Sequence, residues 1–162
     1  MPNTAARTRF VADAMLGSLA RKLRALGFDT TYFKTGTDSA ILGIAAHEGR
    51  IILTSDRLLA ARASSKLLGV ILLAGTSDAA RLGEIAATAR KSGLQLAAGA
   101  PLCSLCGGDL EQVGRAAVSG VVPQMVEDRH RLFFMCRSCG QIYWKGGHWK
   151  KLRSLARRLR AK

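Results

Sequence analysis

Four cysteines in two identically spaced pairs are the clearest chemical feature of this 162-residue sequence. Cys103 and Cys106 form the first pair and Cys136 and Cys139 the second, and a glycine directly follows each pair. Two residues between the cysteines let both thiolates of a pair face one ion, and the glycine permits the left-handed backbone that completes the turn. Two such turns predict a tetrahedral site of four sulfurs, which is typical of zinc.

A thioredoxin-like redox pair and ordinary buried thiols are the alternatives. A redox site needs one such pair, normally at a helix N-terminus, whereas this sequence has two. Zinc is therefore the favoured interpretation. Because four thiolates leave no position open for a substrate, we expect this zinc to be structural. His148 could replace one ligand, but we favour contact with nucleic acid or solvent for it.

Aspartates follow two apolar segments that are typical of buried strands. Asp13 follows residues 10–12, and Asp56 follows residues 51–54. The carboxyl ends of parallel strands meet at one sheet edge, which Asp38, at the start of a predicted helix, can also reach. Carboxylates that converge repel one another unless a cation lies among them, and their oxygens suit Mg²⁺ or Mn²⁺. Such an ion activates water and neutralises the charge that develops during attack on a phosphodiester. The sequence thus predicts a catalytic metal site at these three residues.

Helix capping is the alternative role for these carboxylates. Aspartate is common at helix N-caps, and Asp38, Asp56 and Asp78 each precede a helical pattern. Capping is the better interpretation of any one of them, whereas Asp13 and Asp56 together, at two strand ends, favour the metal site. We expect Asp78 to be a cap, and the alternative is a possible fourth acidic residue of the site.

Apolar runs alternate with helical patterns from about residue 9 to residue 96. This alternation predicts the α/β class, with a parallel sheet flanked by helices. We expect strands at residues 10–12, 30–33, 51–54 and 70–73, each followed by a helix. Short β-like pieces follow at 132–135 and 141–144. The predicted domains are residues 1–99, a zinc ribbon at 100–149 and a basic C-terminal helix at 150–162.

The sequence is strongly basic, with 25 Lys and Arg against 11 Asp and Glu, a net charge of +14 and a pI near 10.7. Such a protein usually binds a polyanion, and nucleic acid is the commonest one. We see no secretory signal and no apolar run of membrane-spanning length, so we expect a cytoplasmic protein with no membrane partner. No small-molecule substrate is expected, and the oligomeric state stays open.

Three segments resemble one known family. Residues 10–29, which read Phe-Val-Ala-Asp-Ala-Met-Leu-Gly and continue to Gly27-Phe-Asp, resemble the opening of a PIN-like ribonuclease family with a C-terminal zinc ribbon. This family is named after the C-terminal domain of the mutator-seven exonucleases. Residues 50–59 resemble its second signature, and the cysteine pairs with residues 142–149 resemble its ribbon. The resemblance extends from about residue 9 to residue 149.

The resemblance implies a PIN-type α/β/α fold at residues 1–99, a carboxylate-bound divalent metal and RNA as substrate. It carries the metal-binding role to Asp13, Asp38 and Asp56. Basic residues of the first helix and the tail would bind phosphates, and aromatic residues among lysines suit base stacking. The residues expected to bind RNA are Arg21, Lys22, Arg24, Arg57, Tyr143, Trp144, His148, Trp149, Lys150 and Lys151. Packing inside the ribbon is an equally weighted alternative for Tyr143 and Trp144.

The sequence therefore predicts a metal-dependent ribonuclease, in endonuclease mode. One alternative is a non-catalytic RNA- or ribosome-binding protein whose aspartates only cap helices. Another is a toxin-type PIN ribonuclease, against which the zinc ribbon argues.

Overall fold

Two separate sheets form the framework of the molecule. The computed structural model describes residues 8–147, 154, 156 and 159. The predicted RNA-binding residues His148, Trp149, Lys150 and Lys151 lie outside the described residues. Within them, four strands form the first sheet and three form the second.

The four-stranded sheet is parallel throughout. Its strands are β1 (Arg9–Ala12), β2 (Asp29–Tyr32), β3 (Ile51–Thr54) and β4 (Val70–Leu72), arranged in the order β2-β1-β3-β4. β1 has β2 on one side and β3 on the other, so the strand order reverses at β1. The carboxyl edge beside such a switch point is where α/β sheets form sites.

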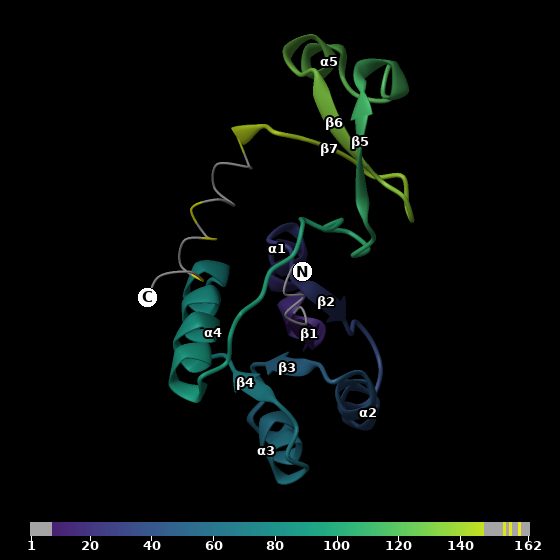
Figure 1. The fold of residues 1–162 in the computed structure, drawn as a ribbon. Helices are drawn as coiled ribbons and strands as arrows, with labels where there is room; N and C mark the ends of the chain where they lie inside the picture. The colour runs from purple at the N-terminus through teal and green to yellow at the C-terminus, as the bar shows by residue number, and fades with distance from the viewer. Residues whose placement is uncertain (1–7, 148–153, 155, 157–158, 160–162) are drawn as a thin grey trace, which may run out of the picture.

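Helices cover both faces of this sheet (Figure 1). One face carries η1 (Ala14–Leu16), α1 (Gly17–Ala25) and α4 (Asp78–Ser92), and the other carries α2 (Asp38–Glu48) and α3 (Arg57–Ser65). Side chains of a strand alternate between faces. Phe10 and Ala12 therefore pack toward α1 and α4, and Val11 packs toward α2 and α3. The predicted α/β class, with a parallel sheet flanked by helices, is confirmed.

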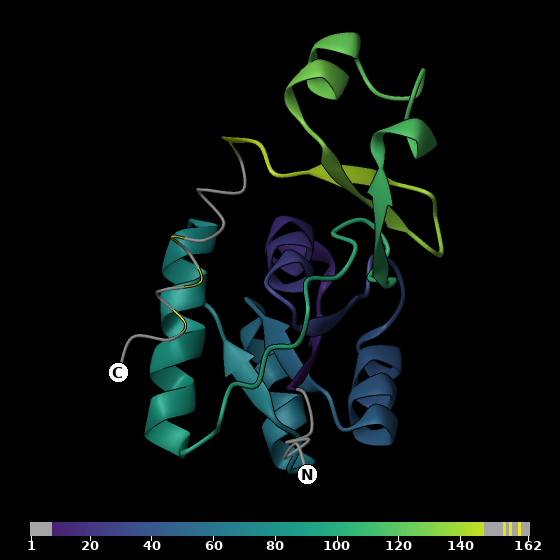
Figure 2. The ribbon, with the colours of Figure 1, turned by 45° about the horizontal axis from the view of Figure 1, so that its top comes forward.

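The three-stranded sheet is antiparallel and holds the cysteine pairs near one end. Its strands are β5 (Leu110–Gly114), β6 (Leu132–Cys136) and β7 (Ile142–Trp144), in that order. Between β5 and β6 the chain forms η2 (Arg115–Ala117) and α5 (Gln124–Arg129), which the sequence did not predict. Both views place this sheet on the α1 side of the molecule (Figure 2).

The C-terminal segment returns to the first sheet. Ser154, Ala156 and Leu159 are helical, and Leu159 packs against the core cluster that also contains residues of α1 and α4. Among the described residues, no helix is both long enough and apolar enough to cross a membrane.

Candidate functional site

Asp13 is the first residue after β1 and is fixed from two directions. Its backbone N–H donates to the carbonyl oxygen of Leu53 on β3, at 3.1 Å. Its Oδ1 accepts the N–H of Met15 at 3.1 Å and so caps η1, and its Oδ2 accepts the hydroxyl of Thr54. The carboxylate is half-buried and keeps one orientation because these bonds restrain both oxygens.

Asp56 lies two residues beyond the end of β3 and is the N-cap of α3. Its Oδ1 accepts the N–H groups of Leu58 at 2.7 Å and Leu59 at 3.3 Å. Its own N–H donates to the hydroxyl of Thr54 at 2.9 Å. The fully buried Thr54 hydroxyl thus joins the carboxylate of Asp13 to the backbone of Asp56. These two aspartates are helix caps and at the same time neighbours at the sheet edge.

Asp38 reaches the same edge from the other side but does not cap its helix. Thr37 is the N-cap of α2, and Asp38 is the first helical residue. Its Oδ2 accepts a hydrogen bond from Nη1 of Arg62 on α3, at 2.7 Å. Both side chains of this ion pair are nearly half exposed, so the pair contributes little to stability.

A cavity of about 210 Å³ is lined by all three aspartates. Met15, Phe33 and Lys34 also line it, and none of them was predicted as a site residue. The three carboxylates do not form a tight ligand cluster: in the described part of the chain, the four cysteines are the only group of three or more such residues whose ligand atoms all lie within 4.8 Å of one another. Mg²⁺ and Mn²⁺ do not require such a cluster, because they bind through one or two carboxylates and retain several waters. Their metal-binding role stays a prediction.

Asp78, the possible fourth acidic residue, faces a different neighbour. Ser77 rather than Asp78 is the N-cap of α4. The Asp78 carboxylate pairs with Lys22 and accepts the hydroxyl of Ser18 at 2.6 Å, which joins α4 to α1. Burial alone would raise the pKa of Asp78, but the bonds from Lys22 and Ser18 lower it below its ordinary value. Asp78 does not line the cavity, and it pairs with Lys22, whose contact with RNA stays a prediction.

The prediction that Arg24 binds RNA is wrong. Its side chain is 7% exposed, and its Nε donates to the carbonyl of Thr30 at 2.7 Å. Its Nη1 donates to the carbonyls of Leu105 at 2.8 Å and Ser104 at 3.3 Å, between the first two cysteines. Arg24 therefore fastens the first cysteine turn to α1. Its position on α1 was apparent from the sequence, but the segment that covers it was not.

Arg21 and Arg57 are exposed, as phosphate-binding residues must be. Arg21 lies on α1, and Arg57 begins α3 directly after Asp56. Their contact with RNA stays a prediction.

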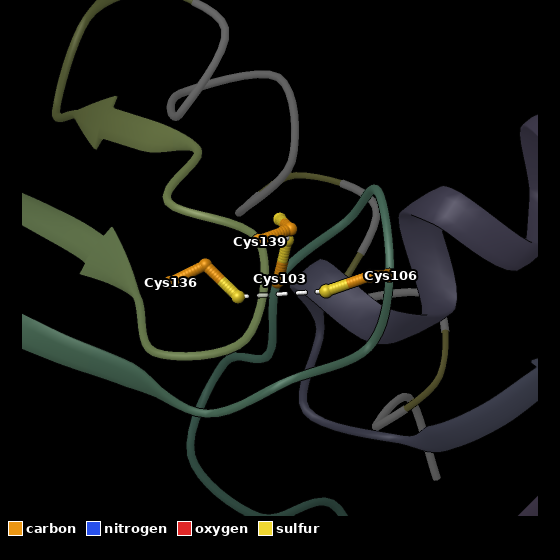
Figure 3. A group of neighbouring side chains, drawn as sticks. All are labelled: Cys103, Cys106, Cys136 and Cys139. Atoms are coloured by element: carbon orange, nitrogen blue, oxygen red, sulfur yellow. Dashed lines mark hydrogen bonds between the residues drawn. The ribbon is translucent and has the colours of Figure 1, made fainter.

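The four cysteines converge on one point (Figure 3). The Sγ atoms of Cys103 and Cys139 are 3.6 Å apart, and those of Cys106 and Cys136 are 3.4 Å apart. A tetrahedral ion with Zn–S bonds of about 2.3 Å separates its sulfurs by about 3.8 Å. The donor set and its spacing therefore fit a zinc ion, which these four residues would hold.

The two cysteine turns have the same backbone geometry. Gly107 donates its N–H to the carbonyl of Cys103 at 2.8 Å, and Gly140 donates to that of Cys136 at 2.9 Å. Both glycines are left-handed, with φ of +85° and +72°. The repeated C-x-x-C-G sequence thus folds as two matching turns, as its spacing predicts.

Tyr143 belongs to the cysteine site. Its hydroxyl lies 3.1 Å from Sγ of Cys103 and 3.1 Å from Oγ of Ser104. Burial opposes ionisation of Cys103, but hydrogen bonds from Tyr143 and from backbone N–H groups lower the pKa of this thiol to about 6. The predicted alternative of packing inside the ribbon describes Tyr143. Trp144 is 37% exposed and keeps a face open to solvent.

The comparison with protein families agrees with this geometry. Residues 8–156 match the model of the Mut7-C RNAse domain. The chain belongs to this family. The match covers both the carboxylate edge and the cysteine site, so the resemblance seen in the sequence is confirmed. No curated protein and no solved structure matches the chain.

Proposed function

We propose that this Mut7-C family member is a metal-dependent ribonuclease that hydrolyses RNA phosphodiester bonds. The observation that carries the proposal is the placement of Asp13 and Asp56 at the carboxyl ends of two adjacent parallel strands, joined through Thr54 and lining one cavity with Asp38. Membership of an RNase domain family supports the same reaction class.

In this proposal Asp13 and Asp56 would hold Mg²⁺ or Mn²⁺, and Asp38 would complete or orient its shell of oxygen ligands. The ion, when bound, lowers the pKa of the attacking water and neutralises charge that develops on the phosphodiester. Thr54 keeps the Asp13 carboxylate and the start of α3 in fixed relation. Arg57 and Lys34 are exposed beside the carboxylates and bind the phosphates on either side of the attacked one.

The further parts of the proposal concern zinc, the cleavage mode and the location. Zinc at the four cysteines is structural, because four sulfurs complete its shell. The enzyme is an endonuclease that acts in the cytoplasm.

A second candidate function is RNA binding without catalysis. The observation in its favour is that each carboxylate already has a structural partner. Asp13 and Asp56 cap η1 and α3, and Asp38 pairs with Arg62. Under this alternative the carboxylates would stabilise the fold only.

Cleavage of a labelled single-stranded RNA, with added Mn²⁺ or Mg²⁺, tests the first proposal against the second. Asn caps helices as well as Asp does, so Asp13→Asn and Asp56→Asn remove charge while they keep the caps. The control is Asp128→Asn, which removes a carboxylate from α5. We expect cleavage by wild type and by Asp128→Asn, and its loss in the two site variants.

The metal is best tested by omission rather than by EDTA, because EDTA would also remove zinc. Zinc content is measured in every sample. Absence of cleavage by wild type, with RNA binding intact and zinc bound, would reject the nuclease and favour the binding protein.

A further inference from the structure

Two large apolar side chains stand exposed beside the carboxylates. Met15 is 76% exposed and Leu58 is 75% exposed. Each lies two positions after a carboxylate: Met15 follows Asp13, and Leu58 follows Asp56. A single exposed apolar residue is ordinary in a folded protein. The same placement twice, at the two carboxylates of one cavity, calls for a common explanation.

Hydrogen bonds hold both residues against the carboxylates. The N–H of Met15 donates to Oδ1 of Asp13 at 3.1 Å, and the N–H of Leu58 donates to Oδ1 of Asp56 at 2.7 Å. Met15 also lines the cavity. The Leu58 side chain does not line the cavity, but its backbone is bonded to a carboxylate that does. Both residues are therefore fixed next to the carboxylates, Met15 inside the cavity and Leu58 outside its lining.

The chemistry of a polynucleotide accounts for apolar side chains at this place. A phosphodiester is flanked by one nucleoside on each side, and the faces of the bases are its main apolar surfaces. Cations would suffice to bind the phosphates, whereas Met15 and Leu58 offer only apolar area. Methionine in particular packs well on aromatic rings through its sulfur.

We propose that Met15 and Leu58 bind the nucleobases on either side of the attacked phosphodiester, a contact that requires these bases to be unpaired. In a duplex the base faces stack on one another and are not available to side chains, whereas in single strands they are. This inference rests on the proposed ribonuclease function and adds two residues that contact the bases of its substrate.

The test compares a single-stranded RNA that has one mapped cleavage site with the same RNA in a duplex. A third substrate lacks the bases on both sides of that site. The variant is Met15→Ser/Leu58→Ser, and the control is Val121→Ser, an equally apolar residue that is 70% exposed outside the four-stranded sheet. Because the side chains are exposed, the variants should fold, and thermal unfolding checks this.

We expect kcat/KM on the intact single strand to fall about tenfold in the double variant, mainly through KM, and to be unchanged in the control. On the substrate without the two bases, wild type and double variant should be equal. Met15→Leu/Leu58→Met, which restores apolar area, should recover cleavage. The inference is overturned if kcat/KM of the double variant falls equally on the intact RNA and on the RNA without the two bases. It is also overturned if the double variant prefers the single strand over the duplex as strongly as wild type does.

A separate binding measurement distinguishes this inference from the ribonuclease proposal. Fluorescence anisotropy with Asp13→Asn as background follows RNA affinity without cleavage. If wild type cleaves no RNA, the ribonuclease proposal fails, and the base contact is then decided by affinity alone. Weaker binding of the intact RNA, but not of the RNA without bases, by Met15→Ser/Leu58→Ser in that background supports the contact. Equal affinities reject it.

Discussion

Thr54 is the residue through which the two strand-end aspartates are connected. Its hydroxyl donates to Oδ2 of Asp13 and accepts the N–H of Asp56, and its side chain is fully buried. A buried polar group that loses its partner costs more than the hydrogen bond contributed. The effect of Thr54 should therefore be seen in stability and in activity together.

Thr54→Val removes the hydroxyl at nearly constant shape. It leaves the Asp56 N–H without an acceptor, so we expect a loss of about 1–3 kcal/mol in the free energy of unfolding. We also expect slower RNA cleavage, because the carboxylate of Asp13 loses one of its two restraints. Thr54→Ser, which keeps the hydroxyl, is the control and should retain most activity. Urea unfolding and cleavage rates measure the two effects, and equal behaviour of both variants would contradict this role.

At the scale of single residues, the sequence predicted positions well and partners poorly. Asp13 and Asp56 could be placed at one edge because strand ends of a parallel sheet coincide. The burial of Arg24 could not be predicted, since the carbonyls that it binds come from a segment about 80 residues away. The same holds for Lys22, whose partner Asp78 lies on another helix.

At the scale of elements, Gly27 is where α1 ends and the later chain crosses it. Its φ is +92°, and its carbonyl accepts the N–H of Gly99 at 2.8 Å. A Cβ at this position would lie 2.2 Å from the carbonyl oxygen of Gly99. Gly27 is therefore required both for the left-handed turn and for the close approach of the segment that leads to the cysteines.

Gly93 provides a matched control for Gly27. It ends α4 with φ of +70°, and a Cβ there would meet nothing within 4 Å. Gly93→Ala should cost about 1–2 kcal/mol, which is the left-handed strain alone. Gly27→Ala should cost about 2 kcal/mol more, because the new Cβ overlaps backbone. Chemical unfolding of both variants measures the difference, and equal losses would show that the crossing does not depend on Gly27.

The contact of α4 with α1 should depend on pH through Asp78. Its bonds with Lys22 and Ser18 lower the pKa of its carboxyl in the folded protein, against the effect of burial. The unfolded chain then binds protons more readily than the folded one. The stabilisation is therefore complete above the ordinary Asp value near 4 and is lost as pH falls through the lowered pKa.

Asp78→Asn tests this pH dependence. The variant should be less stable than wild type at pH 7, and the difference should shrink as the pH falls below about 4. Because both proteins contain the cysteine site, its own acid sensitivity cancels in the comparison. A difference that stays constant from pH 7 to pH 3 would contradict the ion pair.

The elements themselves were predicted to different degrees. The four parallel strands were expected within one or two residues. Apolar runs indicated three of them, as is characteristic of buried parallel strands, and β-branched and aromatic residues indicated β2. β5 and α5 were missed. β5 has two adjacent polar residues, Glu111 and Gln112, in place of an apolar run, and α5 has only six residues. Their structure depends on pairing with β6 and on a small core at Val118, Val122 and Phe133.

At the scale of the whole molecule, the cysteine turns are tied to the four-stranded sheet by the backbone and by one side chain. The N–H of Leu102 donates to the carbonyl of Arg24 at 2.9 Å, beside the guanidinium bonds to Ser104 and Leu105. The same guanidinium binds Thr30 on β2. Arg24 thus contacts the sheet and the zinc-binding segment at the same time.

This arrangement predicts that zinc binding and the stability of the α/β layers are coupled. Arg24→Met fills similar volume but leaves three carbonyls without their donor, and it should lower the free energy of unfolding by about 3 kcal/mol. Cys103→Ser removes a zinc ligand and loosens the turn that Arg24 binds. The loss of stability in the Arg24→Met/Cys103→Ser double variant should be about 1–2 kcal/mol smaller than the sum of the losses in the two single variants, because both substitutions remove the same contact.

Arg21→Met is the matched control for this coupling. Arg21 lies on the same helix but is exposed, so its substitution should cost little, and its effect should add to that of Cys103→Ser. Zinc content and urea unfolding of all variants give the coupling energy of Cys103→Ser with Arg24→Met and with Arg21→Met. Zinc loss that destabilises Arg24→Met as much as wild type would mean that the ribbon folds independently of α1. A coupling confined to Arg24 would mean that the metal stabilises the helix that follows Asp13, and with it the carboxylate edge.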